Sequence, residues 1–80
     1  MITYFFEDNK FIYLLTYNGF NELNLEISNN KIQSETIIKI TDEQCSEFEK
    51  LATEFEETEN ATKIKQFLWR ITNEQTRTIN

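Results

Sequence analysis

Apolar residues recur with the period of β-strands over the first forty positions of the chain. The clearest case is the segment 20–28, where Leu23, Leu25 and Ile27 alternate with polar residues, as in a strand with one buried face and one wet face. Similar runs separated by polar turn residues predict four strands, at residues 2–6, 11–17, 20–28 and 31–40. Because strands joined by short connections usually pair as neighbours, we expect a four-stranded antiparallel β-meander.

Two of these runs carry further information. Residues 11–17 are apolar at both odd and even positions, which predicts a central strand buried on both faces. They are followed by Asn18-Gly19, a dipeptide typical of a two-residue type I′ hairpin turn, because both residues tolerate positive φ. In the last run we expect Ile38 and Ile40 to point inward and Ile37 to point the other way.

The apolar period becomes helical from residue 41 onward. Thr41 and Gln44 match a capping box, which marks the start of a helix. Two helical stripes follow, the first made of Cys45, Phe48, Leu51, Ala52 and Phe55, the second of Ala61, Ile64, Leu68 and Ile71 with Phe67 on its flank. On one straight helix these stripes would be about 160° out of phase. We therefore expect a break between Glu56 and Asn60, with Thr58 or Asn60 capping a second helix.

The predicted fold class is α+β, in the order β-β-β-β-α-α, with both helices packed on one face of the meander. A chain of 80 residues is expected to form a single domain. Within it we place the meander at residues 1–40, the two helices at 41–75 and a frayed polar tail at 76–80.

The composition removes most catalytic and metal-binding chemistry. The chain has no histidine, one cysteine and one glycine, which argues against a zinc site, a histidine base and a glycine-rich phosphate loop. Cys45 has two interpretations, a thiol activated at the start of a helix or a small core residue, and the second is favoured because no histidine can pair with it. We therefore expect a protein that is not an enzyme and that holds no cofactor or metal.

The N-terminal segment has no basic region followed by a long apolar run, so no signal peptide is expected. The longest apolar stretch, Phe11 to Leu15, is far shorter than the roughly 20 residues needed to span a bilayer. Asn, Ile and Lys are frequent and Pro is absent, which hints at an AT-rich genome such as that of a low-GC bacterium or its phage. The expected location is the cytoplasm of a bacterial host cell.

Negative charge is concentrated in one segment. The net charge is −6, but residues 42–59 alone hold eight acids and one base, Lys50. Such a surface repels nucleic acid and membranes and attracts basic proteins. It is either the solvated face of a helix or a surface that imitates nucleic-acid phosphates; in the second case the partner-binding residues are Glu43, Glu47, Glu49, Glu54, Glu56, Glu57 and Glu59. Four cations nearer the C-terminus are expected to pair within the chain: Lys63, Lys65, Arg70 and Arg77.

Aromatic residues are abundant for a thin sheet, with seven Phe, three Tyr and one Trp. Either the helices and the sheet edges cover all of them, or one face stays exposed and forms an interface. The candidate interface aromatics are Phe5, Tyr13 and Tyr17, and such a face would allow a homodimer.

In its size, its coarse order of elements and its acidic stretch from Asp42 to Glu59, the chain resembles the small acidic anti-CRISPR inhibitors that phages encode. The resemblance implies a protein partner, a basic nucleic-acid-handling enzyme whose binding cleft is blocked by carboxylates that stand in for phosphates. No direct contact with nucleic acid or membrane is implied. The alternative that the residues leave open is a homodimeric accessory or immunity-type protein that binds through the aromatic sheet face.

Overall fold

The computed structural model describes the backbone of residues 1–79 and the side chains of residues 1–73. It contains four strands followed by two helices, which is the predicted α+β order. Contacts along the chain group it into two compact units, Met1–Ile40 and Thr41–Asn80. The first unit is the sheet and the second is the helical pair.

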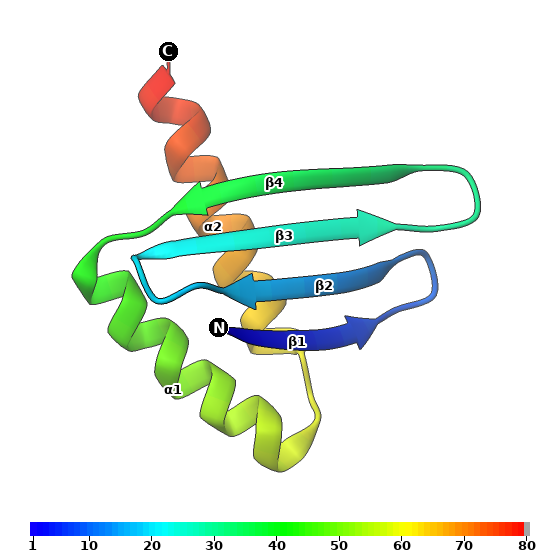
Figure 1. Ribbon diagram of the computed structural model, residues 1–80, viewed down its shortest axis with the longest axis horizontal. Helices are drawn as coiled ribbons and strands as arrows, with labels where there is room; N and C mark the ends of the chain where they lie inside the picture. Colours follow the sequence, from blue (N-terminus) through cyan, green and yellow to red (C-terminus); the bar gives the residue numbers. More distant parts are fainter. Residues whose placement is uncertain (80) are drawn as a thin grey trace. The chain divides into compact units, whose positions relative to one another are not determined.

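The sheet is an antiparallel meander in the order β1-β2-β3-β4, as expected (Figure 1). Its strands are β1 (Ile2–Glu7), β2 (Ile12–Tyr17), β3 (Glu22–Ser28) and β4 (Gln33–Lys39). One row of the register runs straight across all four strands and joins Phe5, Leu14, Glu26 and Glu35. Directly paired residues share a face, so these four side chains lie on the same side of the sheet.

Only one face of the sheet is buried. The buried side chains of this unit are Tyr4, Phe6, Tyr13, Leu15, Leu23, Leu25, Ile38 and Ile40. The expected inward positions of Leu23, Leu25, Ile38 and Ile40 are thus confirmed, while Ile27 is only half-buried. The prediction that β2 is buried on both faces is wrong, because its alternate side chains project to the opposite side, which remains open.

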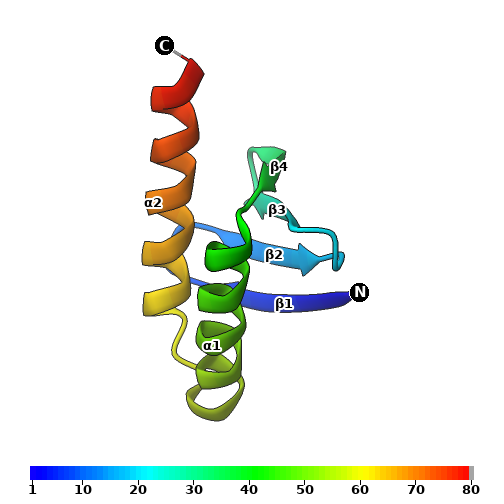
Figure 2. The same ribbon diagram turned by 90° about the vertical axis from the view of Figure 1, so that its left-hand side faces the viewer.

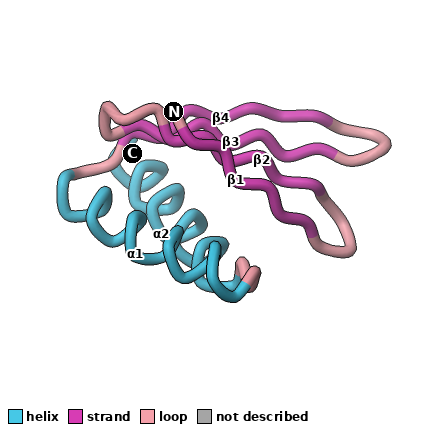
Figure 3. Tube along the Cα trace, turned by 60° about the horizontal axis from the view of Figure 1, so that its bottom comes forward, coloured by secondary structure: helices cyan, strands magenta, loops and turns pink. Residues whose placement is uncertain are grey.

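The hairpins β1–β2 and β3–β4 turn at the same end of the sheet, and their loops have the same construction (Figure 3). In the loop 8–11 the Oδ1 atom of Asp8 accepts hydrogen bonds from the backbone N–H groups of Lys10 and Phe11, at 2.8 and 2.9 Å. In the loop 29–32 Asn29 Oδ1 accepts hydrogen bonds from the backbone N–H groups of Lys31 and Ile32, both at 2.8 Å. In each loop the side chain at the first position therefore accepts hydrogen bonds from backbone N–H groups that are not paired between the strands.

The β2–β3 hairpin differs from the expected two-residue turn. Its loop has four residues, 18–21, between Tyr17 and Glu22. Gly19 has a φ of 88° and Asn21 a φ of 55°, so the two positive φ angles are two residues apart rather than adjacent. Asn18 Oδ1 accepts a hydrogen bond from the N–H of Phe20 at 3.0 Å, as at the start of the other loops. The hairpin was thus predicted correctly but its turn type was wrong.

The helical unit contains α1 (Asp42–Thr58) and α2 (Thr62–Ile79). The capping box is confirmed: Thr41 Oγ1 accepts from the N–H of Gln44 at 3.1 Å, and Gln44 Oε1 accepts from the N–H of Thr41 at 2.9 Å. The expected break is also present, because the residue after α1, Glu59, adopts the left-handed conformation with a φ of 58°. Ala61 occupies the N-cap position of α2, one residue after the predicted Asn60, since its C=O accepts the first helical hydrogen bond, from the N–H of Lys65. Asn60 Oδ1 accepts from the N–H of Thr62 at 2.9 Å and so satisfies the first N–H group of α2.

The two helices run antiparallel and contact each other (Figure 2). Phe48 of α1 and Phe67 of α2 meet with ring centroids 6.1 Å apart, and both are buried. The predicted stripes supply the other buried side chains, which are Ala52, Ile64, Leu68 and Ile71. α2 continues to Ile79, whereas the sequence predicted a tail from residue 76; residue 80 lies outside the described residues.

Candidate protein-binding surfaces

The acids of α1 fall into sets because their spacing follows the helical repeat. Glu47 and Glu54 are seven residues apart, nearly two full turns, and therefore lie on one line along the helix. Glu47 pairs with Arg70 of α2 at 2.7 Å, and Glu54 pairs with Lys63 at 2.9 Å. Lys63 and Arg70 are also seven residues apart. Because the helices are antiparallel, the earlier acid of α1 pairs with the later cation of α2 and the later acid with the earlier cation. The expectation that Lys63 and Arg70 pair within the chain is confirmed; the side chain of Arg77 lies outside the described part.

Next to these ion pairs the two helices form a small groove of about 330 Å³, lined by Glu47, Leu51, Lys63, Gln66, Phe67 and Arg70. The guanidinium of Arg70 also lies over the ring of Phe67, 5.3 Å from its centroid, in a cation–π contact. The three charged side chains of this groove, Glu47, Lys63 and Arg70, thus already have partners inside the molecule. Their charges therefore serve the contact between the two helices.

A second set of acids lies elsewhere on α1. Glu49 and Glu56, again seven residues apart, are each two residues beyond Glu47 and Glu54, which turns them about 200° around the helix axis. They are therefore on the side of α1 that faces away from α2. Glu43, Glu49, Glu56, Glu57 and Glu59 are all exposed, and no described cation forms an ion pair with any of them. Of the seven predicted acidic residues, five thus remain open to a partner and two are used internally.

The open face of the sheet, which consists of the side chains on the same side as Phe5 and Leu14, carries four large apolar residues. They are Phe5, Ile12, Leu14 and Ile37, with exposed fractions of 54%, 40%, 37% and 56%. The register joins Phe5 to Leu14 directly, and Ile12 lies two positions along the same strand. Phe5, Ile12 and Leu14 thus form an exposed apolar cluster on β1 and β2, while Ile37 lies on β4.

The three predicted interface aromatics do not share this face. Phe5 lies on the open face, but Tyr13 pairs with Phe6 and is only 3% exposed, while Tyr17 is half-buried. The error has a simple cause: Phe5 and Tyr13 have the same parity in number, but the register pairs Phe5 with Leu14 and so sends Tyr13 to the opposite side. Tyr13 is therefore not available to a partner.

Tyr13 instead has a structural role. Its ring stacks on that of Phe6, with centroids 5.0 Å apart, and its hydroxyl donates a hydrogen bond of 2.9 Å to Asp8 Oδ2. Burial, this hydrogen bond and the charge of Asp8 together raise the pKa of Tyr13 to about 12. Asp8 thus both shapes the first hairpin loop and fixes a core tyrosine.

Two carboxyl groups on the open face were missed by the sequence analysis. Glu26 of β3 and Glu35 of β4 are direct cross-strand partners. The hydrogen bond to Glu35, partial burial and the neighbouring charge of Glu35 raise the pKa of Glu26. The alternation of side chains along each strand indicated that both residues point away from the buried face. Only the register of β3 with β4 shows that they are neighbours. Two positions before Glu26, Asn24 has a buried Oδ1 atom that accepts no hydrogen bond, the one such side-chain atom in the described residues.

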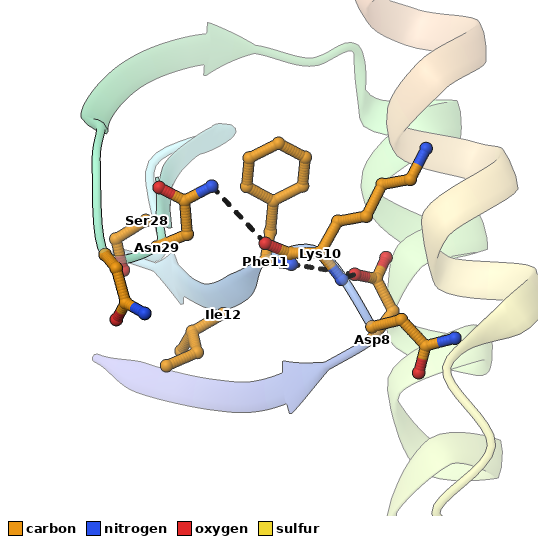
Figure 4. Close-up of a pocket in the computed structure, with 8 residues that line it drawn as sticks. Asp8, Lys10, Phe11, Ile12, Ser28 and Asn29 are labelled. Atoms are coloured by element: carbon orange, nitrogen blue, oxygen red, sulfur yellow. Dashed lines mark hydrogen bonds between the residues drawn. The ribbon is translucent and has the colours of Figure 1, made fainter.

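The space between the two similar hairpin loops forms a small pocket of about 200 Å³ (Figure 4). Asn29 Nδ2 donates to the backbone oxygen of Lys10 at 3.4 Å and links the loops. Asp8 and Asn29, which line the pocket, each use Oδ1 to accept hydrogen bonds from the loop backbone, and Asp8 Oδ2 accepts from the Tyr13 hydroxyl. The pocket is smaller than typical small-molecule sites, which begin at about 300 Å³.

No group of three or more His, Cys, Asp or Glu side chains among the described residues is arranged to hold a metal ion. Cys45 is half-buried, with its Sγ atom 3.9 Å from Glu49 Oε1. Neither helix, over its described residues, has the length and apolar character needed to cross a membrane.

No protein-family model, curated protein or solved structure matches this chain.

Proposed function

We propose that the chain is a non-enzymatic protein-binding module that inhibits a basic, nucleic-acid-handling enzyme in the bacterial cytoplasm through the acidic surface of α1. The observation that supports this proposal is the division of the α1 acids into a paired and an unpaired set. Glu47 and Glu54 are neutralised by α2, whereas Glu43, Glu49, Glu56, Glu57 and Glu59 are exposed without a cation among the described side chains. Residues chosen only for solubility would more often mix signs along an exposed helix.

The exposed acids include a pair held in a fixed position on one helix. Glu49 and Glu56 are separated by a helical rise of about 10.5 Å on the same side of α1. B-DNA likewise presents negative charge at regular intervals, one phosphate per about 3.4 Å of helix axis on each strand. Carboxylates on a rigid helix can therefore occupy cation sites of an enzyme that otherwise hold phosphates. Because the contacts are charged and solvent-exposed, binding should weaken steeply as salt is raised.

The chain offers a matched pair of variants to test this function. Glu49→Gln/Glu56→Gln removes two exposed carboxylates, and Glu47→Gln/Glu54→Gln removes two ion-paired carboxylates with the same spacing from the same helix. Wild type and both variants would be used to capture partners from bacterial lysate at low and moderate salt, followed by mass spectrometry. We expect a nucleic-acid-binding enzyme to be captured by wild type and by the Glu47/Glu54 variant but not by the Glu49/Glu56 variant.

Competition completes the test. Double-stranded DNA added to the purified complex should displace the chain if both occupy one cleft of the enzyme. The proposal fails if the two variants lose the partner equally, since net charge alone would then explain the effect, or if DNA and the chain bind the enzyme together.

A further inference from the structure

The open face of the sheet carries a row of paired side chains that is separate from the acidic surface of α1. This row places the apolar side chains of Phe5 and Leu14 on β1 and β2 next to the carboxyl groups of Glu26 and Glu35 on β3 and β4. One half of the row is apolar and the other half is acidic. Neighbouring strands are about 4.8 Å apart, so the centres of the two halves are separated by about 10 Å.

The whole open face is negatively charged. Its ionisable side chains in the strands are the four acids Glu7, Glu22, Glu26 and Glu35 and the single base Lys39, a sum of −3 when all are ionised. A second copy of this chain would bring the same carboxylates against themselves. A partner with positive charge beside an apolar group would instead complement both halves of the row.

We infer that the open face is a docking surface for another protein whose contact segment presents an apolar side chain to Phe5 and Leu14 and an arginine guanidinium to Glu26 and Glu35. A guanidinium has five N–H donors in a planar fork, which suits two adjacent carboxylates. This contact lies on the sheet unit and does not depend on the proposed role of α1.

The surroundings of Glu26 explain why a cation would bind with proton release. Across β4 the facing group is Glu35, and across β2 it is the uncharged Leu14. On β3 the next acid on this face is Glu22, four residues away and opposite Lys39. No cation of the described strands faces the pair directly, and the hydrogen bond that protonated Glu26 donates to Glu35 raises the pKa of Glu26. An incoming guanidinium would displace the shared proton, so its affinity should increase with pH, by up to about tenfold per pH unit.

A designed peptide makes this testable with the full chain. The probe is an alanine-based helical peptide that carries Leu and Arg seven residues apart on one side, a rise of about 10.5 Å. The control peptide has citrulline in place of arginine, which keeps the shape and removes the charge. Binding would be followed by NMR, with wild type, Glu26→Gln/Glu35→Gln and the charge-matched Glu49→Gln/Glu56→Gln variant.

We expect the arginine peptide to shift the amide signals of Phe5, Leu14, Glu26 and Glu35, and to bind at least about tenfold more tightly than the citrulline peptide, as charge-assisted hydrogen bonds predict. The Glu26/Glu35 variant should lose this difference. The Glu49/Glu56 variant should keep it, which separates this result from the fate of the α1 proposal.

Three results would overturn the inference. These are no binding of the arginine peptide at millimolar concentration, equal binding of the citrulline peptide, and equal binding by the Glu26/Glu35 variant. Sedimentation of the protein alone provides a further check, because self-association that protects the open face would show that a second copy is its occupant.

Discussion

The carboxylate of Glu47 lies 2.7 Å from the guanidinium of Arg70, and the same guanidinium lies over the ring of Phe67 at 5.3 Å. One side chain of α2 thus contacts both an acid of α1 and an aromatic residue of its own helix. Both charged side chains remain about half exposed, at 43% for Glu47 and 50% for Arg70. Solvent therefore screens the pair, and its contribution to stability is small.

A double-mutant cycle of Glu47→Gln and Arg70→Gln should give a coupling energy of about 0.5 kcal/mol. Arg70→Gln alone should be the more destabilising single change, by roughly a further 0.5 kcal/mol, because it also removes the cation–π contact with Phe67. Chemical denaturation of the four proteins measures both quantities. A coupling energy above about 2 kcal/mol would mean that the pair is much less screened than its exposure indicates.

The hydrogen bond of Asn60 at the start of α2 should contribute more to stability than either ion pair. Asn60→Ala removes the acceptor of the Thr62 N–H and should lower the free energy of unfolding by about 1 kcal/mol, as for a typical hydrogen bond. Asn60→Asp keeps an acceptor oxygen and adds a charge that favours the N-terminal end of a helix, so it should match or exceed the wild type. Thermal denaturation followed by circular dichroism would reveal both effects, and an unchanged midpoint for Asn60→Ala would show that this hydrogen bond does not stabilise α2.

The carboxyl pair of the open face should make stability depend on pH. The pKa of Glu26 is raised in the folded state, so the folded protein holds this proton more tightly than the unfolded chain. Stability should therefore fall as pH rises from the unfolded value of about 4.3 through the raised folded value. Glu26→Gln should be more stable than wild type at neutral pH and should lose this dependence.

Urea titrations at several pH values would measure this dependence. Glu56→Gln, which removes the same charge from α1, is the control. If both variants change stability alike, the effect belongs to net charge and not to the Glu26–Glu35 pair.

Adjacent leucines of β2 should differ sharply in their contribution to stability. Leu15 is fully buried, and Leu15→Ala should cost about 2–5 kcal/mol through lost burial and the cavity left behind. Leu14 lies on the open face and is 37% exposed, so Leu14→Ala should cost about 1 kcal/mol or less. Guanidinium denaturation of the two variants tests the orientation of the strand, since similar losses would mean that both faces are covered.

Local signals in the sequence were sufficient for the elements and their order. The alternation at Leu23 and Leu25 and the capping box of Thr41 and Gln44 are short-range patterns, and each is present as predicted. The phase shift between the two helical stripes likewise located the break before Asn60. These features follow from backbone geometry over a few residues and need no knowledge of the tertiary structure.

The errors concern features that depend on contacts between residues far apart in the sequence. Composition could not tell which side of β2 is buried, because Leu14 and Leu15 are equally apolar. The contact of Glu26 with Glu35 depends on the register of β3 with β4, nine residues apart in sequence. The division of the α1 acids depends on where α2 lies, since Glu47 is distinguished from Glu49 only by the cations that reach it.

The order β1-β2-β3-β4 also has a kinetic consequence. Every strand pairs only with its neighbour along the chain, and the two helices form an antiparallel pair across a three-residue connection. Native contacts therefore close short loops, and low contact order is associated with fast folding, in milliseconds or less for small domains. The sequence contains no proline, so no slow isomerisation step delays it. A protein with this topology is expected to reach its native state soon after synthesis, which is consistent with the inhibitory function proposed above.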